Sequence, residues 1–149
     1  MGTPAIPPQS TRSKYPGMRF KESNMMRDWL GLHESEYDRF DYNVRIGVGR
    51  DPGPQFADWV RKAAIMSSQM RVDCVAWKGD VPLLIELKVF AFARAVQQIT
   101  TYGAVWAAER PGTAQPQLLL VVRGMDDSAK ASAAAAGLRV EVLGRSSGS

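Results

Sequence analysis

The sequence predicts an α/β (α+β) fold in which helices flank a central mixed β-sheet. Some segments have apolar residues at every second position, which is typical of strands, and others have apolar residues at helical spacing. The two kinds of segment are interspersed along the chain. One segment, 117–123, is a nearly continuous apolar run, which indicates a strand buried on both faces of a sheet. The predicted order of elements is α-β-α-β-β-α-β-α-β.

The first three elements are identified by the spacing of their apolar residues. We expect a helix over 18–32, which Gly31 could end, and a strand over 37–48 that leads into a glycine-rich turn. A second helix is expected over 54–67, because Pro54 suits the first position of a helix.

Strands and helices alternate through the rest of the chain. Two strands, 71–77 and 81–89, flank the dipeptide Gly79-Asp80, which is a signal for a two-residue hairpin loop. The remaining elements show regular apolar spacing or alternation and are a helix over 91–110 stopped by Pro111-Gly112, the strand 117–123, a helix over 126–136 closed by Gly137, and a strand over 138–143.

The length and the composition of the two ends predict the domain organisation. The 149 residues suit one domain, which we expect over 18–143. Residues 1–17 contain four prolines and are interpreted as an extended N-terminal arm, and 144–149 as a flexible tail. We expect the arm to join subunits into a homo-oligomer or larger assembly. Its deletion should then remove the assembly and leave the melting temperature of the core nearly unchanged.

Composition excludes several classes of protein. A single cysteine, Cys74, excludes an internal disulfide and a cysteine zinc cage, and a single histidine, His33, argues against a histidine-based triad or zinc centre. The sequence contains no run of about 18 apolar residues, which a transmembrane helix would need. We therefore expect no membrane association and a cytoplasmic location. The net charge of +4 favours a polyanionic partner.

The expected hairpin places charged residues opposite one another. If its Gly-Asp dipeptide forms the loop, the numbers of facing residues add up to 159, so Asp73 faces Glu86 and Arg71 faces Lys88. The period of two puts these four residues on one sheet face. The residues that then point into the core on the other face are Val72, Cys74, Leu83, Ile85 and Leu87.

These facing pairs of like charge are in conflict. Two carboxylates with Cβ atoms about 5 Å apart repel each other, as do two cations. A divalent cation between Asp73 and Glu86 would remove the first conflict, and a phosphate near Arg71 and Lys88 would remove the second. A site built on carboxylates suits a hard cation such as Mg²⁺. The alternative is a pair of crossed salt bridges on a solvated face, Asp73 to Lys88 and Arg71 to Glu86.

The same residues carry a resemblance to a known family. Asp73, twelve intervening residues and then Glu86-Leu87-Lys88 resemble the core motif of the PD-(D/E)xK nuclease superfamily. Gln98 and Tyr102 match the Q-x-x-x-Y motif of its RecB-like branch and share a helix face. Residues 85–102 are also similar to small archaeal and phage nucleases of this class. The resemblance covers about residues 18–143 and implies a restriction-endonuclease-like core, with Val72 in the place of the family's proline and an additional helix at 54–67.

The resemblance implies a metal-dependent DNA nuclease that hydrolyses phosphodiester bonds with Mg²⁺ or Mn²⁺. Asp73, Glu86 and the backbone carbonyl of Leu87 would coordinate the ion. A glutamate of the first helix takes part in the family's motif, and here Glu22 is the best match, with Asp28 next.

The other motif residues receive roles from the same resemblance. Lys88 would position or activate the attacking water and stabilise the charge that grows on the phosphate. Gln98 and Tyr102 would orient the motif or the DNA backbone. Three basic residues are weaker candidates for contacts with DNA, with a solvated surface as the alternative: Arg61, Lys62 and Arg71.

Two interpretations of the function stay open. A nuclease is favoured by the complete set of motif residues. A structural or assembly protein, such as a phage virion or connector component with a nuclease-like fold and little or no catalysis, is favoured by the arm 1–17 and by the lack of a separate DNA-binding domain. A phage origin would place the protein in the host cytoplasm or the virion. Trp77 is interpreted as a core or helix-face residue, with stacking on a base as the alternative.

Overall fold

The computed structural model describes residues 7–144. The helices are α1 (Phe20–His33), α2 (Asp58–Ser68), α3 (Ala93–Glu109) and α4 (Asp127–Ala136), with a short 3-10 helix, Glu34–Glu36, after α1. The strands are β1 (Arg39–Ile46), β2 (Met70–Lys78), β3 (Val81–Ala91), β4 (Gln117–Met125) and β5 (Arg139–Val142). The predicted order of helices and strands is confirmed.

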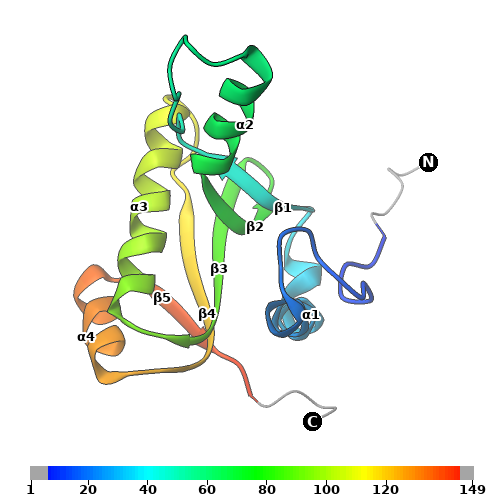
Figure 1. Cartoon of the computed structure of the whole chain (residues 1–149). Coiled ribbons are helices and arrows are strands. Elements are labelled where there is room, and N and C mark those ends of the chain that lie inside the picture. Colours follow the sequence, from blue (N-terminus) through cyan, green and yellow to red (C-terminus); the bar gives the residue numbers. More distant parts are fainter. Residues whose placement is uncertain (1–6, 145–149) are drawn as a thin grey trace.

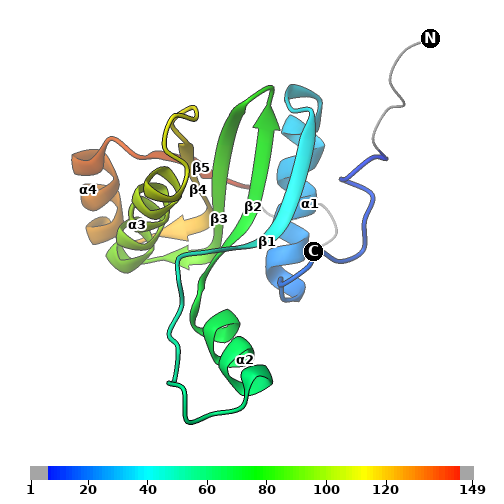
Figure 2. The same cartoon turned by 90° about the horizontal axis from the view of Figure 1, so that it is seen from above.

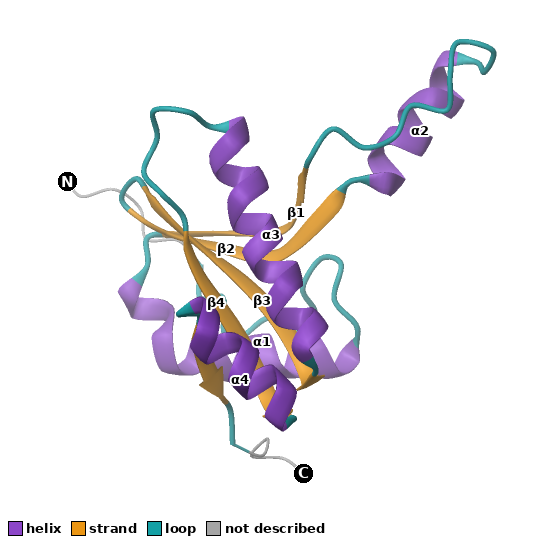
Figure 3. Cartoon of the chain, turned by 90° about the vertical axis from the view of Figure 1, so that its left-hand side faces the viewer, coloured by secondary structure: helices purple, strands orange, loops and turns teal. Residues whose placement is uncertain are grey.

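The five strands form one mixed sheet in the order β1-β2-β3-β4-β5 (Figure 1). The pairs β1–β2 and β2–β3 are antiparallel, and the pairs β3–β4 and β4–β5 are parallel. Helix α1 covers one face of the sheet, and α3 and α4 lie against the other face (Figure 3). The predicted fold class, a central mixed sheet flanked by helices, is confirmed.

Two apolar layers fill the space between the sheet and its helices. On the α1 side, Trp29 and Met26 are fully buried against the sheet. On the other side, Ile99 and Trp106 of α3 pack against Leu84 and its neighbours. The central strand β4 contributes to both layers, since its residues from Leu119 to Val122 are all fully buried. This burial on two faces is what the continuous apolar run of this segment predicts.

Two helix boundaries differ from the prediction. Helix α1 does not end at Gly31 but continues to His33, because Gly31 keeps a helical backbone and does not adopt the left-handed conformation of a helix end. Helix α2 begins at Asp58 and not at Pro54. A turn closed by a hydrogen bond from the Phe56 N–H to the Gly53 carbonyl occupies the preceding residues, so the helix starts after it.

The hairpin register agrees with the prediction. Lys78 pairs with Val81, and Cys74 pairs with Ile85, so the facing residues add up to 159. Gly79 takes a positive φ of 59° in the loop, which a two-residue hairpin requires and which glycine adopts at little cost.

One part of the predicted alternation is wrong. Cys74 packs on the α1 side as expected, but Val72 packs in the layer below α3. On the neighbouring strand, Tyr42 and Val44 are divided between the two layers in the same way. Between them, Asn43 has a left-handed φ of 53°, and the β1–β2 pairing runs from Tyr42–Cys74 directly to Val44–Val72. At Asn43 in β1 and at Asp73 in β2, the alternation of side chains between the two faces of the sheet is therefore shifted by one residue.

The described part of the N-terminal arm packs on its own chain. Tyr15 is only 2% exposed and belongs to the apolar layer below α1. Its hydroxyl donates to the Gln9 carbonyl at 2.6 Å, and the Glu34 carboxylate accepts from the backbone N–H groups of Gln9 and Ser10. These contacts make residues 9–15 part of the folded domain, while assembly through the arm stays a prediction. Residues 1–6 of the arm and 145–149 of the tail lie outside the described residues.

Helix α2 stands away from the rest of the molecule at the ends of β1 and β2 (Figure 2). None of its residues is buried, and Trp59 is 75% exposed. Within residues 7–144, no helix combines the length and the apolar character needed to cross a membrane.

Candidate active site

Asp73 and Glu86 lie on adjacent antiparallel strands and are brought together as predicted. The two carboxyl groups are close enough for each to affect the pKa of the other. The backbone N–H of Leu87 also donates to Asp73 Oδ2 at 2.9 Å. The strand that carries Glu86 therefore fixes the orientation of Asp73.

The pair is buried, and its electrostatics follow from that burial. Glu86 is only 4% exposed. Burial, followed by the nearby charge of Asp73, raises the pKa of Glu86 to about 9, although Lys88 acts in the opposite direction. Burial also raises the pKa of Asp73, against the effects of the Leu87 N–H and Lys88. In the described chain, Glu86 Oε2 is buried without a hydrogen-bond partner. Burial therefore opposes a state in which both carboxyl groups are ionised.

Lys88 lies next to this pair on β3. Its Nζ is 3.7 Å from Glu86 Oε1, and its side chain is 38% exposed. The alternative of crossed salt bridges is not observed, since neither Asp73–Lys88 nor Arg71–Glu86 is an ion pair within 4 Å among residues 7–144. Lys88 thus contacts the acidic pair from one side and reaches solvent on the other.

Helix α3 brings Gln98 and Tyr102 to the same place. Gln98 Nε2 donates to the Tyr102 hydroxyl at 2.6 Å. Burial raises the pKa of Tyr102, and the charges of Glu86 and Asp73 add to the increase, so the phenol lies within electrostatic reach of the carboxyl pair. The two residues of the predicted helix motif are therefore neighbours of the pair.

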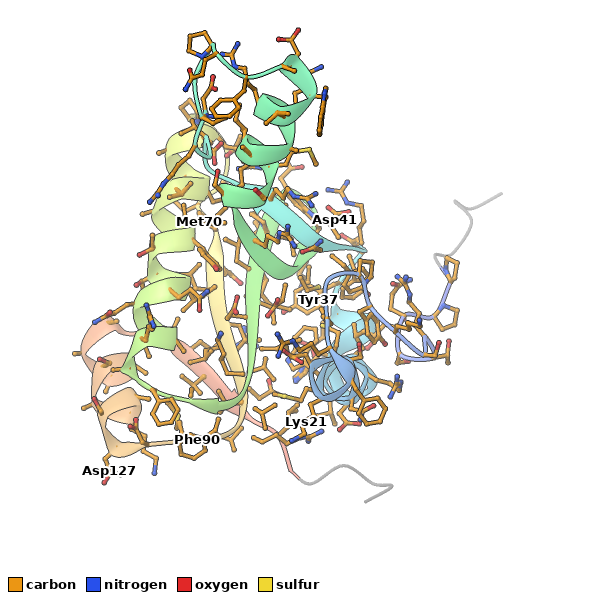
Figure 4. All side chains as sticks on the ribbon, viewed as in Figure 1. Lys21, Tyr37, Asp41, Met70, Phe90 and Asp127 are labelled. Carbon is orange, nitrogen blue, oxygen red and sulfur yellow. The ribbon has the colours of Figure 1, made fainter. Side chains whose placement is uncertain are left out.

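An open groove of about 570 Å³ adjoins Lys88, between α3 and the strands β2 and β3; Met70 of this groove is labelled in Figure 4. The side chains along it are Met70, Lys88, Arg94, Gln97, Gln98, Thr101 and Tyr102. The sequence analysis missed Arg94. Its spacing was the available signal, because Arg94, Gln98 and Tyr102 follow at i, i+4 and i+8 and so share one face of α3.

Arg71 is not brought to the site. It pairs with Arg45 of β1, and the β2–β3 pairing ends at Cys74–Ile85, so Arg71 and Lys88 do not face each other as predicted. The residues on either side of Arg71, Met70 and Val72, pack in the layer below α3, which turns Arg71 toward the other side. The cause is the shifted alternation described above.

The other basic candidates lie on the projecting helix α2. Arg61 forms an ion pair with Asp51 at 2.6 Å, and Lys62 is exposed. Both stand on a helix that points away from the sheet (Figure 2). They would meet only a ligand that extends beyond the groove.

The candidate acids of the first helix do not join the pair closely. The charge of Glu22 contributes to the raised pKa of Asp73, but only as the smallest of the causes. Asp28 instead forms an ion pair with Arg123 at 2.7 Å. Within residues 7–144, no three His, Cys, Asp or Glu side chains form a group that could hold a metal ion. The available protein ligands are therefore two carboxylates and the backbone.

Comparison with known proteins gives similarity of fold only. No family model matches the chain, and no curated protein matches its sequence. EndoMS, solved in complex with double-stranded DNA, is 17% identical with a TM-score of 0.48, over 80% of this chain and 43% of that one. A repair endonuclease from Pyrococcus abyssi is 19% identical with a TM-score of 0.49, over 85% and 47% of the two chains.

A protein of unknown function is 18% identical with a TM-score of 0.48, over 78% of this chain and 54% of that one. The chain therefore spans about half the length of the solved proteins that it matches. At such identities and TM-scores, these matches assign no activity to this chain.

Proposed function

We propose that the protein is a metal-dependent nuclease that hydrolyses phosphodiester bonds in DNA at Asp73, Glu86 and Lys88. The observation that carries this proposal is the buried carboxyl pair, in which Glu86 Oε2 has no hydrogen-bond partner in the described chain. A sheet with no function at this place gains nothing from two buried acids, since each costs free energy unless it is paired. A groove with two further basic side chains, Lys88 and Arg94, adjoins the pair.

The residues present fit a hard divalent cation. Asp73, Glu86 and the Leu87 carbonyl would hold Mg²⁺ or Mn²⁺, because carboxylate and carbonyl oxygens are the ligands that these ions prefer. When bound, such an ion neutralises charge on a phosphate and makes a water molecule more acidic. Two carboxylates are enough for Mg²⁺, which keeps several of its waters.

The neighbouring side chains position the substrate. Lys88 lies beside Glu86 and at the groove, so its ammonium can stabilise the charge that grows on a phosphate and can hold a water for attack. Arg94 would hold a second phosphate of the same strand, because a guanidinium matches phosphate geometry. The hydrogen bond between Gln98 and Tyr102 fixes the direction of the phenol toward the carboxyl pair or the DNA backbone.

The test is cleavage of single- and double-stranded DNA with Mg²⁺ or Mn²⁺. Asp73→Asn, Glu86→Gln and Lys88→Met should each lower the rate by about 100-fold or more. Lys130→Met, which changes an exposed lysine of α4, is the matched control and should keep the wild-type rate. Circular dichroism confirms that the variants are folded. Unchanged cleavage by Glu86→Gln would show that the activity comes from elsewhere.

A second candidate is an assembly protein that keeps the nuclease-like fold with little or no catalysis, as in a phage virion or connector. The projecting helix α2 favours it, because Trp59 and Met66 are 75% and 47% exposed and Phe56 just before the helix is 44% exposed. Exposed apolar residues in one place indicate a contact with another chain. Sedimentation of the full chain separates the two candidates. An oligomer that is inert with both metals contradicts the nuclease, and a monomer that cuts DNA contradicts the assembly protein.

A further inference from the structure

A second cavity, of about 470 Å³, lies at the hairpin-loop end of β2 and β3. The residues used below, Arg39, Trp77, Asp80, Trp106 and Arg110, all line it, and we call it the Trp77–Trp106 cavity. Trp77 follows Asp73 by four residues on β2, which separates the cavity from the carboxyl pair by about 13 Å along the strand. In Figure 2 the loop end of this hairpin points away from α2.

Two tryptophans form the apolar wall of this cavity. The rings of Trp77 and Trp106 are 5.9 Å apart between centroids and tilted by 53°. Trp106 is only 3% exposed, whereas Trp77 is half-buried and offers free surface to the cavity. An arginine guanidinium lies over each ring. The Cζ atom of Arg39 is 4.6 Å from the centroid of Trp77, and the Cζ atom of Arg110 is 3.6 Å from the centroid of Trp106.

The two arginines differ in their partners. Arg39 lies 3.7 Å from Asp41, whose carboxylate also accepts a hydrogen bond from Trp77 Nε1 at 2.9 Å. Arg110 forms no ion pair within 4 Å among residues 7–144, and its Nη1 is buried without an acceptor there. The guanidinium of Arg110 therefore has a donor group that the described chain leaves unused. The acid that lines the cavity, Asp80, is exposed on the hairpin loop.

We propose that the Trp77–Trp106 cavity binds a nucleotide, with the base against Trp77 and the phosphate on Arg110. The volume lies in the range of small-molecule sites. An indole face is a surface on which any nucleobase stacks, and a guanidinium matches a phosphate group with two parallel hydrogen bonds. The nucleotide is either free or the terminal unit of a DNA strand. The proposal does not depend on the cleavage reaction at Asp73 and Glu86.

The experiment is titration of the full chain with deoxyadenosine monophosphate, without divalent metal, followed by calorimetry and by the indole N–H signals in ¹⁵N spectra. The signals of Trp77 and Trp106 should shift, while those of Trp29 in the α1 layer and Trp59 on α2 should not. Deoxyadenosine alone and inorganic phosphate alone should each bind at least about tenfold more weakly. No shift up to about 10 mM nucleotide, or equal binding of phosphate alone, would overturn the proposal.

Two variants of the same residue keep the test independent of folding. Arg110→Gln should weaken binding by at least about tenfold, and Arg110→Lys should also weaken it, because the charge remains and the planar fork is lost. Arg50→Gln, at an exposed arginine outside the cavity, is the matched control and should bind as the wild type does. Wild-type affinity in both Arg110 variants would refute the assignment of the phosphate.

Two further binding experiments distinguish a free nucleotide from a strand end, and the cavity from the carboxyl pair. A short oligonucleotide with a 5′-phosphate that shifts the same two indoles assigns the cavity to a strand end, and a shift with the free nucleotide alone assigns it to mononucleotides. Glu86→Gln should keep the nucleotide binding, so that failure of the nuclease proposal leaves this result unaffected. Loss of binding in Glu86→Gln would instead place the nucleotide at the carboxyl pair and refute the second site.

Discussion

Replacement of Glu86 by glutamine should stabilise the protein, and by more as the pH rises. The folded chain holds the Glu86 carboxyl buried beside Asp73, which raises its pKa to about 9 from an ordinary value of 4.5. Between these two values the folded state binds a proton that the unfolded state has released. The stability that depends on this proton is complete below the unfolded pKa and is lost as the pH rises through the folded one. Glutamine has the same shape and no proton to lose.

The size of the effect follows from the two pKa values. One additional bound proton lowers the free energy of unfolding of the wild type by about 1.4 kcal/mol for each pH unit. Over the two units between about pH 6 and about pH 8, the wild type should lose about 3 kcal/mol relative to Glu86→Gln. For a chain of this length that corresponds to about 6–12 °C in melting temperature.

The assay is thermal or urea unfolding of both proteins between about pH 6 and about pH 8 without divalent metal. Asp127→Asn, which changes an exposed acid at the start of α4, is the matched control. Its stability should stay parallel to that of the wild type across the series. Parallel curves for the wild type and Glu86→Gln would refute the reasoning, because they would show that Glu86 is ionised in both states.

Millimolar Mg²⁺ should raise the melting temperature of the wild type and not that of Asp73→Asn, because the ion binds the folded state; an equal rise in the variant would place the ion elsewhere. Tyr15→Ala should lower the free energy of unfolding by about 3 kcal/mol in urea, because Tyr15 is fully enclosed below α1. Deletion of residues 2–17 should then lower the melting temperature too, contrary to the expectation from sequence. Asn43→Val should cost about 2 kcal/mol and Asn43→Gly less than about 1, because glycine adopts this left-handed φ freely and a β-branched side chain does not. Equal costs for the two variants would contradict a strained backbone at residue 43.

The carboxyl pair could be predicted from sequence because a hairpin loop fixes register by arithmetic. Once Gly79-Asp80 is taken as the loop, the residues from Cys74 to Lys78 each have one partner on β3, and the next position along each strand is Asp73 and Glu86. Helical spacing in the same way places Gln98 and Tyr102 on one face of α3. Both inferences use local geometry that tertiary packing does not alter.

The position of Arg71 could not be predicted because it depends on the conformation of another strand. Alternation assumes extended backbone throughout, and Asn43 departs from it with a φ of 53°. Asparagine is one of the residues that more often adopt a left-handed φ, but a single asparagine in an alternating segment does not predict this departure. Helix α2 is a different case, since apolar spacing predicts that a helix has an apolar face but not what covers it. Here the face that includes Trp59 is left exposed.

The irregular backbone and the acidic pair occupy the same place in the sheet. The regular pairing of β2 stops at Cys74 toward β3 and omits Asp73 toward β1, so Asp73 is held by the Leu87 N–H through its side chain. That hydrogen bond favours the charged form of Asp73, while burial and the charge of Asp73 oppose the ionisation of Glu86. Backbone strain at Asn43 and repulsion between buried acids both lower stability, and neither helps the sheet to form. Glu86→Gln removes the repulsion, so a variant that is more stable than the wild type and has lost cleavage would show that the protein retains Glu86 for its chemistry at a cost in stability.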